Sequence, residues 1–144
     1  MLEIKAEYYP QPARQKAILQ ATLSRLAAGQ DYHFLLLDPE LAQYVDFQPR
    51  EFALLVAELN VKRLSQHSLQ QGFGGLSGHY LLLNKTLQSR HARANQRIGT
   101  GFIHSRNALF RELNRGVEWI FSNRAVHIQE ILDMDLQLLL MLQM

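Results

Sequence analysis

Histidines offer this chain its most direct route to chemistry, because an imidazole nitrogen binds metals and transfers protons near neutral pH. None of the six lies four residues from another with a carboxylate partner, the spacing typical of helical zinc and di-iron sites. Motifs such as HExxH, GxSxG, CxxC and the P-loop are also missing from the sequence, so no familiar motif predicts an enzyme. The histidines are His33, His67, His79, His91, His104 and His127.

Only His91 stands in an apolar context that suggests ligation. If its segment is helical, Leu87 and Leu83 lie one and two turns before it, with Ala94 and Ile98 near the same face. A neutral imidazole on such a face can offer a ring nitrogen to haem iron, since burial disfavours the protonated form. The geometry suits a helix that carries an iron ligand.

Arginines flank the same segment and fit the same hypothesis. The guanidinium groups of Arg90, Arg93 and Arg97 could meet the haem propionates or face water. The alternative is structural: a lone histidine on an apolar helix face is usually a core residue hydrogen-bonded to its neighbours. Periodicity alone does not separate the two interpretations.

The elements that would position these residues are predicted to be helices. Apolar residues recur at helical spacing almost throughout, and no stretch alternates long enough to indicate a half-buried strand. The expected fold is all-α, in one domain spanning residues 1–144, without repeats. The predicted helices cover residues 12–27, 31–37, 38–44, 46–71, 77–97, 102–121 and 124–142.

Composition bounds the class of protein. The 144 residues are 47% hydrophobic and 19% charged, which is typical of a globular protein. The absence of cysteine excludes disulfides and thiolate sites, and the first residues lack an apolar signal segment. No apolar run approaches the roughly 18 residues of a membrane span. We therefore expect a cytoplasmic protein without a membrane partner.

Short motifs near the centre and end of the chain resemble the globin-coupled sensors. These motifs are FGG at 73–75, HAR at 91–93, RIG at 97–99 and the last helix, IQEILDMDLQLLLMLQ. The resemblance covers residues 18 to 142 and implies a globin-like fold that holds haem and senses a diatomic gas such as oxygen. In that family an aromatic-tyrosine pair precedes an Asp-Pro turn, and here Tyr32 precedes Asp38-Pro39 by the family spacing.

The resemblance gives each candidate residue a role. His91 would bind the iron and Tyr32 would donate to the bound gas. Counting from the RIG step instead places the proximal ligand at Asn95, which implies a haem-free globin of the stressosome type. Arg90 and Arg93 keep their place beside the haem. The haem walls would be Leu54, Phe34, Leu87 and Ile98.

The output surface follows from the same resemblance. Sensor globins dimerise through their last two helices, which correspond here to about residues 116–144, and pass the signal to a separate protein or domain. Leucines surround the end of the last predicted helix, more than one buried stripe needs. No output domain follows, so we expect a single-domain sensor or one cut at the domain edge. The apolar residues are Leu138, Leu139, Leu140, Met141 and Leu142.

Two other functions compete with a gas sensor. One is a haem-free interaction or scaffold domain with the same fold. The other is a basic helical nucleic-acid-binding protein, because the stretch from Lys85 to Arg115 carries seven basic residues against the single acid Glu112. That stretch has no helix-turn-helix pattern and its helices are needed for the core, so a nucleic-acid partner is disfavoured. We do not expect an enzyme.

Overall fold

A computed structural model describes residues 1–5 and 11–142, without the side chains of residues 139, 140 and 142. Strands and helices alternate along the chain. The strands are β1 (Leu2–Ile4), β2 (Phe34–Leu36), β3 (Ala53–Ala57), β4 (Gly75–His79), β5 (Arg97–Gly101) and β6 (Trp119–Ile120). The α-helices are α1 (Pro12–Thr22), α2 (Val61–Gln71), α3 (Lys85–Ala92), α4 (Arg106–Asn114) and α5 (Ala125–Leu142), and the 3₁₀-helices are η2 (Pro39–Tyr44) and η3 (Arg50–Phe52).

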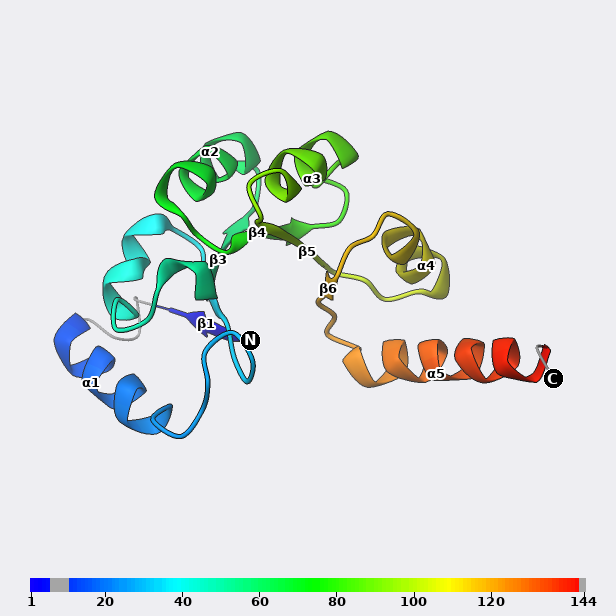
Figure 1. Cartoon of the computed structure of the whole chain (residues 1–144), viewed down its shortest axis with the longest axis horizontal. Coiled ribbons are helices and arrows are strands. Elements are labelled where there is room, and N and C mark those ends of the chain that lie inside the picture. The colour runs from blue at the N-terminus through cyan, green and yellow to red at the C-terminus, as the bar shows by residue number, and fades with distance from the viewer. Residues whose placement is uncertain (6–10, 143–144) are drawn as a thin grey trace.

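All six strands are parallel and pair in the order in which they occur along the chain. Figure 1 shows them curled on the inside of an arc of helices, with β1 and β6 at the two ends of the sheet. A parallel sheet needs a crossover between strands, and helices supply most of these crossovers here. The architecture is therefore an α/β half-barrel, with a convex face toward the helices and a concave face on the inside of the curl.

The main core lies between the convex face and the helices. Successive strand residues point to opposite faces, so Ile4, Leu36 and Leu55 meet Leu64 of α2 while their neighbours turn inward. Leu36, Leu55 and Leu64 are fully buried. A second cluster joins α4 to α5 through Leu109 and Ile128. The apolar packing that stabilises the fold thus lies mainly on the outer side of the sheet.

Local signals begin and end the helices. The side chains of Asn84 and Ser105 accept hydrogen bonds from the backbone N–H groups of Leu87 and Ala108, which caps α3 and α4. Asp38 does the same for η2 by accepting from Glu40 N–H. At the C-terminal end of α2, Gly72 adopts the left-handed conformation (φ 71°) that is common after the last residue of a helix.

The predicted all-α fold is wrong. The predicted helices 12–27, 38–44, 46–71, 77–97, 102–121 and 124–142 each contain an observed helix. Residues 34–36, 53–57, 77–79 and 119–120 lie in predicted helices but form strands, and residues 97–101 form another. The RIG motif, for example, opens strand β5. Strands that are buried in a parallel sheet have short, nearly continuous apolar runs, and these runs match a helical pattern as well as a strand.

Helix α5 carries apolar side chains on its exposed side as well, as expected of the last helix. Leu136 and Leu138 are half exposed and Met134 more so. The homodimer predicted through residues 116–144 stays a prediction. Residues 143 and 144 and the side chains of Leu139, Leu140 and Leu142 lie outside the described residues. In the described part of the chain, no helix is long and apolar enough to cross a membrane.

Candidate functional site

His91 lies on α3 and is completely buried. Its Nδ1 is 2.7 Å from Gln96 Oε1, and its Nε2 is 2.8 Å from Ser65 Oγ on α2. The Gln96 oxygen can only accept, and Gln96 Nε2 donates to Ser68 O at 2.7 Å, so His91 Nδ1 carries the proton. Nε2 then accepts from the Ser65 hydroxyl. Both ring nitrogens are thus satisfied within the chain.

This hydrogen-bonded group, Ser65, Ser68, His91 and Gln96, fastens α3 to α2 beneath the helix layer. Burial lowers the pKa of His91, the hydrogen bond to Gln96 opposes that effect, and Arg90 adds a smaller lowering. The imidazole therefore stays neutral at physiological pH. The structural interpretation of His91 accounts for every contact that the ring makes.

The other residues predicted around a haem do not share one pocket. Leu54 is buried on the concave face of β3, whereas Phe34 and Ile98 belong to the convex core with Tyr32 and Leu87. The sheet separates Leu54 from His91. Tyr32 OH is buried without a hydrogen-bond partner, and burial raises its pKa.

The flanking polar residues are also dispersed. Arg90 and Arg93 are exposed at the end of α3, and Asn95, the alternative ligand position, lies in the following turn with φ 54°. The roles given to these residues, and haem itself, depended on a globin fold. They stay predictions without that support.

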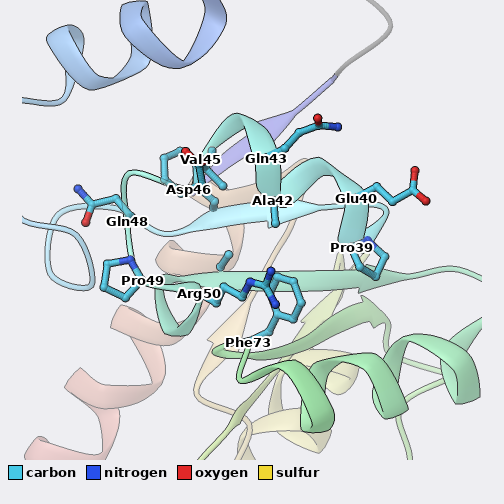
Figure 2. Close-up of a pocket in the computed structure, with 12 residues that line it drawn as sticks. Pro39, Glu40, Ala42, Gln43, Val45, Asp46, Gln48, Pro49, Arg50 and Phe73 are labelled. Atoms are coloured by element: carbon cyan, nitrogen blue, oxygen red, sulfur yellow. The ribbon is translucent and has the colours of Figure 1, made fainter. Parts of the chain in front are cut away.

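Three cavities deserve comparison as candidate sites. One lies on the convex side between η2 and Phe73, where the Arg50 guanidinium sits 5.5 Å from the centre of the Phe73 ring (Figure 2). A second lies at the amino ends of the strands, where His33 contacts Trp119 across the concave face with 4.6 Å between ring centres. The third lies at the carboxyl ends of the strands.

The carboxyl-end cavity receives residues from every strand. Its volume is about 400 Å³. In parallel α/β barrels the binding residues sit at the carboxyl ends of the strands, because the loops there are free to vary while the rest of the barrel holds the fold. This cavity is the candidate site. Its lining is Glu3, Leu35, Val56, Ser77, Gly78, Gly101, Phe102, Ile120, Phe121, Ser122, Asn123 and Ala125.

One charged residue of β1, Glu3, lines this cavity, and a second follows the strand. Lys5 lies just after β1, with its Nζ 3.7 Å from Glu3 Oε1. Both side chains remain about half exposed. A carboxylate can accept a proton from water and an ammonium can hold an anion. The pair can therefore serve both parts of a hydrolytic reaction on an anionic substrate.

Glycines shape the floor of the cavity. A Cβ at Gly99 would lie 2.5 Å from the Phe121 ring, so only glycine lets that ring pack against β5. Ser77 Oγ would be 3.3 Å from the same Cβ. The concave face is thus closely packed at Gly99, and the cavity lies toward the carboxyl ends of the strands. Within residues 1–5 and 11–142, no group of three or more histidine, cysteine, aspartate or glutamate side chains is placed to hold a metal ion.

Sequence reasoning missed Glu3, Lys5 and Phe102 because it looked for histidines on helices. The signal that could have found the charged pair is its position: Glu3 and Lys5 alternate with Leu2 and Ile4, a polar side beside an apolar side. The run is too short to have been recognised as a strand by itself.

No protein-family model and no curated protein sequence matches the chain. Its fold does match solved structures. The structure from Silicibacter pomeroyi, assigned as a glycerophosphoryl diester phosphodiesterase, has a TM-score of 0.70 and 18% identity over 92% of this chain and 50% of its own. A glycerophosphodiester phosphodiesterase from Parabacteroides distasonis gives 0.65 and 16% over 93% and 56%.

A third structure, from Agrobacterium tumefaciens and assigned like the first, gives 0.62 and 15% over 83% of this chain and 51% of its own. The chain thus spans about half the length of each of these proteins. These matches and the parallel sheet overturn the resemblance to globin-coupled sensors and with it the haem gas sensor, the haem-free globin scaffold and the basic helical protein. The expectation that the chain is not an enzyme is contradicted too, because each of these three structures is assigned as a phosphodiesterase. What the chain shares with them is the fold of a half-barrel.

Proposed function

We propose that this chain forms the substrate-binding part of a barrel that hydrolyses phosphodiesters of the glycerophosphodiester type. The observation that carries the proposal is the cavity at the carboxyl ends of the strands, with the Glu3–Lys5 pair beside it. The three solved structures with this fold support the class of substrate, since each is assigned to that activity.

The two charged residues then have distinct tasks. The Lys5 ammonium binds a non-bridging oxygen of the diester and offsets the charge that develops as water attacks phosphorus. The Glu3 carboxylate accepts a proton from that water. The new P–O bond replaces the ester bond to one alcohol, which leaves with a proton from solvent. The products are a phosphomonoester and a free alcohol.

Substrate binding is tested with glycerophosphoglycerol and the purified chain, by calorimetric titration. Removing the ammonium in Lys5→Gln is expected to weaken binding about tenfold, in the range of one charge-assisted hydrogen bond. Lys62→Gln is the matched control, because Lys62 is exposed on α2 on the convex side. Equal affinity in Lys5→Gln and wild type, or no saturable binding by wild type, would contradict the proposal.

Hydrolysis is tested by the release of phosphomonoester from the same diester. Glu3→Gln is expected to lower kcat at least about 100-fold without changing the dissociation constant by more than about threefold, as for loss of a general base. A variant that hydrolyses at the wild-type rate would remove Glu3 from the mechanism. Glu51→Gln, at an exposed position before the amino end of β3, provides the control carboxylate.

A further inference from the structure

Four flat groups form a continuous stack beside the candidate cavity. The Arg111 guanidinium on α4 lies 4.4 Å from the centre of the Tyr80 ring. Tyr80 stacks on His79 at 4.6 Å and 27°, and His79 stacks on Phe102 at 5.2 Å and 24°. The stack thus runs from the helix layer to Phe102, which lines the cavity.

Phe102 ends the stack in an unusual state. Its side chain is 60% exposed, and its backbone has φ 65°, a left-handed conformation that is rare for a bulky residue. Such strain is unfavourable and persists only where the surroundings impose it. The adjacent Ile103 is fully buried, so the strained turn separates an anchored residue from an exposed ring.

Hydrogen bonds on both sides hold this turn. Tyr80 N–H donates to Gly101 O at 3.4 Å, and Ile103 N–H donates to Phe121 O at 3.4 Å. His104 Nδ1 lies 2.8 Å from Phe102 O, and as the protonated nitrogen it donates to that oxygen. These hydrogen bonds fix the backbone of the turn, and the Phe102 ring, stacked on His79, remains mostly exposed. Strain of this kind is typical of ligand sites.

We propose that the open side of Phe102 is a stacking subsite for a flat ring, such as a nucleobase, carried by one alcohol of the phosphodiester. This inference rests on the function proposed above and adds the class of substituent. A base placed there would become the fifth member of the stack, and its phosphate would lie in the cavity that Phe102 and Glu3 both line. Stacking of a base on an aromatic side chain is favourable for any base, because every base has a π face.

The geometry favours a flat ring over a cationic substituent. The rings of the stack are nearly parallel, which continues naturally into another parallel ring. Recognition of a quaternary ammonium uses several aromatic faces arranged around the cation, whereas Phe102 offers one. Two cations already stand nearby, Arg111 at the far end of the stack and Lys5 beside the cavity.

The test compares two phosphodiesters that differ only in the base: the methyl ester of adenosine 5′-monophosphate and the methyl ester of ribose 5-phosphate. Wild type is expected to bind the adenosine ester about tenfold more tightly, the effect of one stacked base. Base protons should also shift upfield in NMR spectra from the Phe102 ring current. The methyl ester of phosphocholine is the third ligand and tests for a cation subsite.

Phe102→Gly is the decisive variant, because glycine adopts φ 65° without strain and the protein should remain folded. It is expected to bind both esters equally, with the affinity for the ribose ester within twofold of wild type. Phe102→Tyr keeps a ring and should retain the preference for the adenosine ester. Thermal melting confirms the fold of each variant.

The outcomes separate this inference from the proposed function. If the ribose ester binds and depends on Lys5, but the adenosine ester binds no better, only the stacking subsite is refuted. A preference for the adenosine ester that survives in Phe102→Gly refutes it as well, and so does a preference for the choline ester. If neither ester binds, both proposals fail together.

Discussion

The convex face of the curled sheet is packed against helices, whereas its concave face borders a cavity. On the convex face, apolar side chains meet helices, and two buried ionisable side chains are paired: His91 with Ser65 and Gln96, and Glu112 with Arg111 and Arg115. On the concave face, Glu3, Lys5 and Phe102 remain accessible around a cavity. Polar side chains that are buried and paired therefore stabilise the fold, while those exposed at the ends of strands belong to the candidate site.

Glu112 provides the strongest test of the convex face. Its carboxylate is fully buried on α4, 2.8 Å from Arg115 Nη1 and 2.9 Å from Arg111 Nε, and Arg115 also donates to Leu83 O. Glu112→Gln leaves Arg115 without its counter-charge, so we expect a loss of about 3 kcal/mol in the free energy of unfolding. Urea titration measures this loss.

Glu118→Gln is the control for that experiment. Glu118 is two-thirds exposed and lies 3.5 Å from Arg97, a surface pair that should be worth about 0–1 kcal/mol. Equal losses in the two variants would show that the convex polar cluster adds nothing beyond a surface ion pair. The distinction between the faces would then lack an energetic basis.

The pH dependence of the free energy of unfolding tests the hydrogen-bonded group around His91. The pKa of His91 is lowered in the folded state, so below about pH 6.5 the unfolded chain binds the proton more readily. The free energy of unfolding should therefore fall as pH drops below about 6.5, by at most about 1.4 kcal/mol per pH unit for this one group. The loss ends once pH is below the folded pKa.

In His91→Gln the free energy of unfolding should depend less on pH. Urea titrations at intervals of about half a pH unit, between about pH 7.5 and pH 5, measure this dependence. His33 adds a slope of the same sign, because burial, Arg97 and the chain amino terminus lower its pKa, yet it is only partly buried. His33→Gln should therefore flatten the slope less. A larger effect in His33→Gln would reverse the ranking of the two histidines.

The sequence could predict the helices that carry their own signals and could not predict the sheet. Asp38 and Pro39 mark η2, and the long apolar pattern marks α5, because caps and 3.6-residue periodicity are local. β2 and β3 are the runs FLL and ALLVA, apolar on both sides because helices and the curl cover both faces. Nothing local distinguishes such runs from one helical turn.

The spacing of the strands is the signal that the sequence did contain. β3, β4, β5 and β6 begin at residues 53, 75, 97 and 119, so each begins 22 residues after the one before. The prediction that the sequence has no repeat concerned residues, whereas the recurring unit here is one of strand, helix and turn. The helical pattern drew attention to His91 on an apolar face, whereas Glu3 lies in a strand of three residues, too short to recognise, and Lys5 follows it.

The smallest expected effect completes the comparison of the two faces. Glu3→Gln makes the same chemical change as Glu112→Gln, but Glu3 is exposed and its ion pair with Lys5 is long, at 3.7 Å. We expect the free energy of unfolding to change by less than about 1 kcal/mol, as for surface pairs. Urea titration of the two glutamine variants side by side measures the contrast. A loss at Glu3 as large as that at Glu112 would make Glu3 a structural residue. A lower kcat in Glu3→Gln would then no longer assign proton transfer to Glu3, because damage to the fold would explain it.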